Sequence, residues 1–224
     1  MKNRRQDSED ILGFTLIELL VVLGIISILA ALLYPVFLSS KQNAQNITCI
    51  SNLHQIGISI DMYCQDYDDY LPYASDPATK YVVQQGLPEY GSTIDKAILN
   101  LPVIMTILHP YGAFSKIFLC PCDTQPQQVI GNLHGDSWYA IYGSSYLYSD
   151  WNGLLVTPLS YFQQPADSYL MGDGWCYHDK PQDNSMACGF FNVLHIDMHV
   201  KALTPLQRED AIDISDRFAI QNVN

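Results

Sequence analysis

The sequence predicts an α+β protein in which a long N-terminal helix packs, by its second half, on a small antiparallel β-sheet domain. Residues 14–38 form a nearly unbroken apolar run, and from Ile50 to Tyr67 apolar residues recur at three- and four-residue steps. That spacing places them on one face of a helix. Farther along, short apolar runs alternate with Gly, Pro, Asn and Asp, which is typical of strands joined by turns.

The apolar run is long enough to cross a membrane, because about 20 apolar residues span a bilayer as a helix. Lys2, Arg4 and Arg5 precede it. Basic residues on that side favour a cytoplasmic N-terminus and an exported remainder. A signal anchor is one alternative. A cleaved secretory signal fits less well, because the run is too long and no A-x-A-like site closes it.

Glu18 is the only charged residue within this run. A carboxylate in hydrocarbon is costly, so its presence indicates a function and a partner. If the chain is cut between Gly13 and Phe14, the new α-amine lies about one helical turn from this carboxylate. The carboxylate of one copy could then pair with the amine of a neighbouring copy.

Gly13-Phe14-Thr15-Leu16-Ile17-Glu18 resembles the processing signal of type IV prepilins and type II secretion pseudopilins. The resemblance implies that a prepilin peptidase cuts after Gly13 and methylates Phe14, and that Glu18 acts in assembly. Pro35 matches a proline found in many pilin helices, where the ring kinks the helix. The implied divisions are a leader (1–13), a transmembrane and assembly helix (14–38), its exported amphipathic continuation (39–69) and a globular α+β pilin-like domain (70–224).

The same resemblance implies a structural subunit of a type IV pilus-like filament or a type II secretion pseudopilus, polymerised through its N-terminal helix. The implied partners are the prepilin peptidase, other copies and other pilin-like subunits in a helical filament, and an inner-membrane assembly platform. The expected location is the inner membrane, with the C-terminal domain exported, and later a periplasmic or extracellular filament. The alternative is a minor pilin, a binding module whose exported domain recognises a substrate or surface.

The net charge of −12 argues against nucleic acid as a partner, because binding phosphates requires Lys and Arg. The sequence contains neither a G-x-S-x-G elbow nor a phosphate-binding loop. We therefore expect no enzymatic activity, with a membrane-anchored exported enzyme as a third alternative. We expect no cofactor other than calcium.

Secondary structure after the apolar run follows from local signals. The first helix should end near Asp66–Asp69, because Leu71-Pro72 breaks it. A second helix over 93–108, capped by residues 92–95, should be interrupted at Pro102. Thr204-Pro205-Leu206-Gln207 should start another helix. The strand-like runs are 116–120, 145–149, 168–171, 189–196 and 199–203.

The second half also resembles a pseudopilin-like family common in planctomycetes. The resemblance is carried by C-x-x-N-L-x-Q-I-G from Cys49, C-P-C-D from Cys120, Ser145-Tyr146, and N-V-L-H-I-D-M-H-V from Asn192. Family members usually have serine in place of Cys122 and glycine in place of Met198. The methionine disfavours the positive φ that a two-residue Asp-Gly turn needs.

Two groups of residues raise the question of a metal. His195, Asp197 and His199 are close in sequence, but a turn at Asp197-Met198 would pair Ile196 with His199 and point the two histidines to opposite faces. We therefore interpret this segment as a structural hairpin. Asp66, Asp68 and Asp69 are interpreted as a solvated helix end. The candidate calcium ligands, by analogy with major pseudopilins, are Asp173, Asp179 and Asp183.

All six cysteines follow the apolar run, so they would be exported to a compartment where disulfides persist. Cys49 and Cys64 are too far apart on one helix to pair with each other. Cys176 and Cys188 bracket a polar loop, which predicts a disulfide between them. A second bridge would join Cys49 or Cys64 to Cys120 or Cys122. The alternative is that the thiols stay free and buried.

Overall fold

The computed structural model describes residues 14–87, 91–124, 127–128, 134–135, 137–175, 178 and 189–221. It divides into two compact units, residues 1–41 and 42–224. Helix α1 (Leu16–Asp66) contributes its first part to one unit and its second part to the other.

In the first unit, α1 is apolar on all sides. Its large hydrophobic side chains from Phe14 to Leu38 are each between 42% and 81% exposed. Pro35 lies inside the helix. Of the described part of the chain, α1 is the helix that is long and apolar enough to cross a membrane, with a mean hydropathy of 2.9 over its most apolar stretch.

In the second unit, the apolar stripe of α1 forms part of the core. Cys49, Leu53, Ile56, Ile60 and Cys64 are fully buried, and they belong to one cluster that includes side chains of the β-sheet. Gly57 allows a close approach there, because a Cβ at that position would lie 2.9 Å from Leu194 Cδ1. The predicted packing of the helix on the sheet is therefore confirmed.

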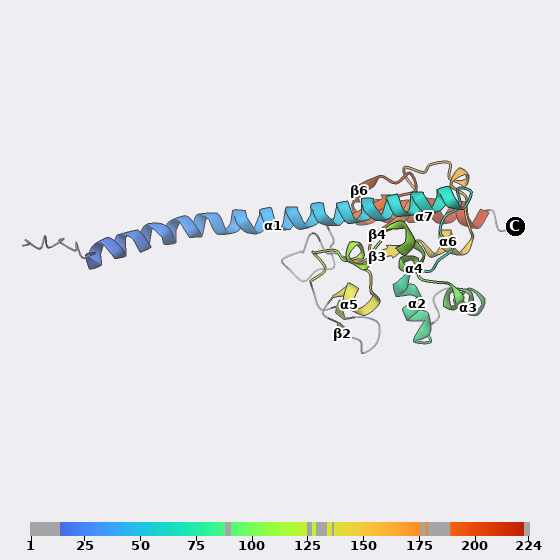
Figure 1. Ribbon diagram of the computed structural model, residues 1–224, viewed down its shortest axis with the longest axis horizontal. Coiled ribbons are helices and arrows are strands. Elements are labelled where there is room, and N and C mark those ends of the chain that lie inside the picture. Colours follow the sequence, from blue (N-terminus) through green and yellow to red (C-terminus); the bar gives the residue numbers. More distant parts are fainter. Residues whose placement is uncertain are drawn as a thin grey trace, which may run out of the picture. The chain divides into compact units, whose positions relative to one another are not determined.

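The main sheet has four antiparallel strands in the order β3-β4-β5-β6. Successive residues of β5 point to opposite faces: Leu194 joins the cluster under α1, and Val193 joins a second cluster that includes Ala211 of α7. The sheet is thus covered on one face by α1 and on the other by α7. Figure 1 shows these elements, whose bounds are β3 (Tyr146–Tyr148), β4 (Tyr169–Asp173), β5 (Phe191–His195), β6 (Val200–Leu203) and α7 (Pro205–Gln221).

Four of the five predicted strands are confirmed as β3 to β6, but the one at 116–120 is wrong. That segment contains a 3-10 helix, η2 (Ser115–Phe118). Its backbone carbonyls accept hydrogen bonds that belong to no β-ladder. Ser145 N–H donates to Phe118 O at 2.8 Å, and Asn52 Nδ2 donates to Leu119 O at 2.9 Å. A short apolar run carries too little periodicity to separate these two outcomes.

The predicted helix over 93–108 is two helices separated near Pro102, as expected. Its first part is preceded by Gly91 at the N-cap position. The side chain of Ser92 lies outside the described residues, so the predicted cap stays a prediction. The capped start at Thr204 is confirmed, because Gln207 Oε1 accepts from Thr204 N at 3.0 Å. The connecting helices are α2 (Pro77–Gln84), α3 (Ser92–Asn100), α4 (Ile104–Leu108), η1 (His109–Tyr111), α5 (Trp138–Tyr142), α6 (Asp150–Leu154) and η3 (Leu159–Tyr161), with a small β1–β2 ladder at Gln127–Gln128 and His134–Gly135.

The β5–β6 hairpin differs by one residue from its predicted register. Leu194 pairs with Val200, and His195 N–H donates to His199 O at 2.9 Å. The loop therefore has three residues and ends at Met198, whose φ is 67°, as in hairpins with a single left-handed residue. A shift of the pairing register by one residue moves each side chain of the strand to the other face of the sheet. The prediction that the two histidines point to opposite faces is therefore wrong: the rings of His195 and His199 stack with centroids 4.4 Å apart.

A buried pair of carboxyl groups joins α2 to the sheet. Asp76 accepts backbone hydrogen bonds from Ala78 and Thr79 at the start of α2, and from Tyr148 in β3. Asp150 accepts from the backbone N–H of Asp76 at 2.8 Å. Burial, and then the nearby charge of Asp150, raise the pKa of Asp76 from 3.8 to about 8.

This raised pKa predicts a pH dependence of stability. The folded state binds the proton of Asp76 more tightly than the unfolded chain, so the contribution is full below about pH 4 and is lost as the pH rises to about 8. Asp150→Asn removes the neighbouring charge and keeps an oxygen for the N–H of Asp76. We expect urea midpoints at pH 5 and pH 8 to differ less in this variant than in the wild type. An unchanged pH dependence would contradict this account.

Candidate functional site: the N-terminal segment and the cysteine cluster

The start of α1 is held by a reciprocal hydrogen-bonded cap between Thr15 and Glu18. Glu18 Oε2 accepts from Thr15 N at 2.9 Å and from Thr15 Oγ1 at 2.6 Å. The N–H of Glu18 donates to Thr15 Oγ1 at 3.3 Å. This is the capping box that a T-x-x-E sequence favours at a helix start. The spacing was readable from the sequence, but our interpretation of Glu18 considered only its charge in the apolar run.

The cap places the carboxylate beside the chain end that cleavage would create. Phe14 is 74% exposed and directly precedes the capping residue Thr15. Gly13, the predicted cleavage residue, lies outside the described residues. The exposed apolar surface of the helix that follows can face either lipid tails or the same helix of neighbouring copies, because both surroundings are apolar.

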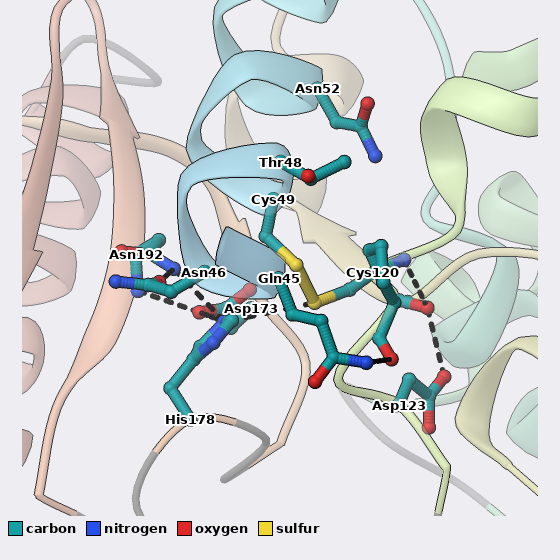
Figure 2. The surroundings of a disulfide bond; sticks show 12 residues. Gln45, Asn46, Thr48, Cys49, Asn52, Cys120, Asp123, Asp173, His178 and Asn192 are labelled. Carbon is teal, nitrogen blue, oxygen red and sulfur yellow. Dashed lines mark hydrogen bonds and ion pairs between the residues drawn. A yellow bond between two sulfur atoms is a disulfide. The ribbon is translucent and has the colours of Figure 1, made fainter. Parts of the chain in front are cut away.

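A second cluster of chemically reactive side chains lies where α1 meets the C-P-C-D segment from Cys120. Cys49 of α1 is joined by a disulfide to Cys120, with an S–S distance of 2.11 Å (Figure 2). This pair confirms the expected bridge from the helix to the C-P-C-D segment. Cys64 and Cys122 are free thiols. Cys176 and Cys188, the other predicted pair, lie outside the described residues.

The C-P-C-D segment is fixed by hydrogen bonds from three directions. Asp123 accepts from the backbone N–H groups of Trp138 and Tyr139 and from Ser145 Oγ. Ser145 Oγ in turn accepts from Cys120 N at 3.1 Å. Gln45 of α1 donates to the carbonyl of Pro121 at 3.2 Å. The segments of the second sequence resemblance therefore meet at one place and hold the disulfide there.

Asp173 faces this cluster and does not lie in a loop as the calcium prediction assumed. It is fully buried at the end of β4. Its Oδ2 lies 3.0 Å from His178 Nε2 and accepts from Asn192 N at 2.6 Å (Figure 2). Asp179 and Asp183 lie outside the described residues, so calcium binding stays a prediction.

At the end of α1, Asp68 and Asp69 adopt positive φ, and Tyr111 donates to Asp66 at 3.0 Å.

Comparisons with known proteins agree with the N-terminal part of this site. A family model described as the prokaryotic N-terminal methylation motif matches residues 11–34. Type II secretion system core protein G of Pectobacterium carotovorum subsp. carotovorum is 30% identical over 126 residues, which cover 55% of this chain and 69% of that protein. The proteins of the same description from Aeromonas hydrophila and Escherichia coli K12 are 36% identical over 70 residues and 31% identical over 84 residues.

These last two matches cover 46% and 57% of the respective relatives, and 31% and 38% of this chain. No solved structure matches the chain significantly.

A processing motif followed by an exposed apolar helix, which continues into a small α+β domain, defines a protein of the type IV pilin-like class. Within that class, the chain belongs to the family of type II secretion system core protein G, the pseudopilins. An apolar N-terminal helix in a pseudopilin fits anchoring in a membrane.

Proposed function

We propose that this chain is a structural subunit of a type II secretion pseudopilus, cut after Gly13, methylated at Phe14 and polymerised through α1. The family membership supports a pseudopilus subunit. The observation that carries the assembly step is the single carboxylate of the apolar segment, Glu18, capped at the helix start next to Phe14. The peptidase would supply the missing partner by creating an α-amine on Phe14.

The apolar surface of α1 supports the same proposal. Every large hydrophobic side chain from Phe14 to Leu38 is exposed. Such a surface is stable in a bilayer before assembly and against equivalent helices afterwards. In this arrangement the N-terminus starts on the cytoplasmic side, the domain from residue 42 is exported, and other pilin-like subunits and an inner-membrane platform are the partners.

Fractionation tests this proposal. With its own secretion machinery overproduced, we expect the chain to appear as a principal component of sheared fibres that electron microscopy can image. The matched control is the same strain without the prepilin peptidase, in which the chain should stay in the membrane at its unprocessed mass. A minor pilin would appear in fibres only in traces. A chain that stays wholly with membranes in both strains would refute the proposal.

A further inference from the structure

Three sulfur atoms and an imidazole converge at the point where α1 meets the C-P-C-D segment. The sulfurs of Cys49, Cys120 and Cys122 and a ring nitrogen of His178 all lie within 4.8 Å of one another. Two of these sulfurs form the disulfide, and the third is a free thiol. A thiol this close to a disulfide has the components needed for thiol–disulfide exchange.

The two described free thiols differ in their surroundings. Cys64 is fully buried in the core, and burial raises the pKa of its thiol to about 12. A thiol in that environment is inert. Cys122 is half-buried, and the hydrogen bonds of its neighbours Pro121 and Asp123 hold its backbone in place. Cys122 is therefore the thiol that can react.

His178 links the free thiol to the disulfide. Its Nε2 lies 3.7 Å from Cys120 Sγ and 3.0 Å from the buried Asp173 carboxylate. Burial alone would lower the pKa of His178, but hydrogen bonds with Asp173 and then with Cys122 raise it to about 9. The ring is therefore mostly protonated at pH 7, and its positive charge lies beside the three sulfurs.

We infer that Cys122, His178 and the Cys49–Cys120 disulfide form a thiol–disulfide exchange site. Cys122 gives its thiol proton to solvent, and the thiolate, beside the positively charged His178 ring, attacks Cys49 Sγ. The Cys49–Cys120 bond breaks as the Cys49–Cys122 bond forms. The Cys120 sulfur leaves as a thiolate beside His178 Nε2 and takes a proton from solvent. Atoms and electrons balance, and no external oxidant or reductant takes part.

The direction of attack follows from the chain. Attack on Cys120 would create a disulfide between two cysteines separated only by Pro121, in a small ring that disulfide geometry disfavours. Attack on Cys49 keeps α1 bonded to the same loop, two residues farther on. It also expels Cys120, the sulfur that His178 Nε2 contacts. The exchange site thus gives the helix two alternative covalent attachments to the domain.

Differential alkylation of the full chain in detergent tests this inference. Free thiols are blocked with N-ethylmaleimide at pH 8, and disulfides are then reduced and blocked with iodoacetamide. Fragmentation of the peptide that contains Cys120 and Cys122 assigns each label. In the wild type we expect maleimide on both cysteines in different molecules, with Cys49 protected in all of them. Maleimide on Cys122 alone, or Cys122 protected by Cys176 or Cys188, would overturn the inference.

Two matched variants sharpen the result. Cys122→Ser should leave Cys49 and Cys120 both protected. Cys120→Ser, equilibrated in a glutathione redox buffer that supplies the oxidant, should also leave Cys49 protected, now by a disulfide to Cys122. A maleimide-labelled Cys49 in Cys120→Ser contradicts the exchange site. If that variant does not fold, the wild-type labelling pattern decides alone.

The role of His178 is tested by the rate of alkylation. His178→Gln keeps a polar side chain but removes the positive charge beside the sulfurs. We expect Cys122 to react with N-ethylmaleimide at pH 7 about tenfold more slowly in this variant, because a cationic neighbour activates a cysteine as a nucleophile. Cys64, which is buried, should stay unlabelled in both proteins, which shows that each is folded. An unchanged rate at Cys122 would remove His178 from the site.

Discussion

Glu18→Gln is expected to abolish incorporation into filaments while leaving membrane insertion and processing intact. Removing a charge from the apolar segment eases insertion. Glutamine still accepts hydrogen bonds in a capping box, so the helix start seen at Thr15 and Glu18 should persist. The lost component is the negative charge that would pair with the α-amine of Phe14 in a neighbouring subunit. Sheared fibres and membranes, probed separately for the processed chain, measure this outcome.

Thr15→Ala is the matched control for this prediction. It removes the hydroxyl that caps the helix and bonds to Glu18 but keeps the carboxylate. Loss of such a cap costs about 1 kcal/mol of helix stability. If the charge matters for assembly, Thr15→Ala enters filaments and Glu18→Gln does not. Normal filament yield from Glu18→Gln, or equal loss in both variants, would show that Glu18 acts only as a helix cap.

Cys49→Ala is expected to lower the free energy of unfolding of the exported domain by about 4 kcal/mol. The Cys49–Cys120 disulfide closes a sequence separation of 71 residues. In the loop-entropy model, a cross-link of that span removes about 4 kcal/mol of conformational freedom from the unfolded chain. Urea unfolding of the full chain in detergent, followed by near-UV circular dichroism, measures the loss, because α1 carries apolar side chains of this core.

Cys120→Ser provides a sharp comparison. The loss of a simple disulfide would destabilise both variants equally. With the exchange site, a Cys49–Cys122 disulfide forms in Cys120→Ser once a glutathione redox buffer supplies the oxidant, and most of the stability returns. A loss below about 1 kcal/mol in Cys49→Ala would show that the disulfide contributes little and that packing alone holds α1 on the sheet.

The elements with strong periodicity could be predicted from the sequence. The apolar run and the stripe that ends near Tyr67 predicted α1, and four strand-like runs predicted the four-stranded sheet. The β5–β6 register could not be predicted, because it depends on whether Met198 accepts positive φ, as it does at 67°. With one more residue in the loop, His195 lies opposite His199 on the same face of the sheet, and the two rings stack.

The functional residues were predictable to different degrees. The Gly13–Glu18 motif is local, so its identity was readable, and the T-x-x-E spacing also contained the capping box. The cysteine cluster depends on long-range contacts. Asp173 and His178 approach the disulfide because the pairing of β4 with β5 brings Asp173 next to Asn192, which contacts both residues. Sequence spacing narrowed the bridge to Cys49 or Cys64 and to Cys120 or Cys122, and only the fold selects one pair.

The most direct measurement for the central claim is the mass and N-terminal sequence of the mature protein. Intact-mass and peptide analysis of the chain from its native membrane should show that residues 1–13 are absent and that Phe14 carries one methyl group on its α-nitrogen. That amine is the partner that the Glu18 carboxylate requires. A mature chain that retains Met1 to Gly13, or one that begins at a residue other than Phe14, would contradict the account.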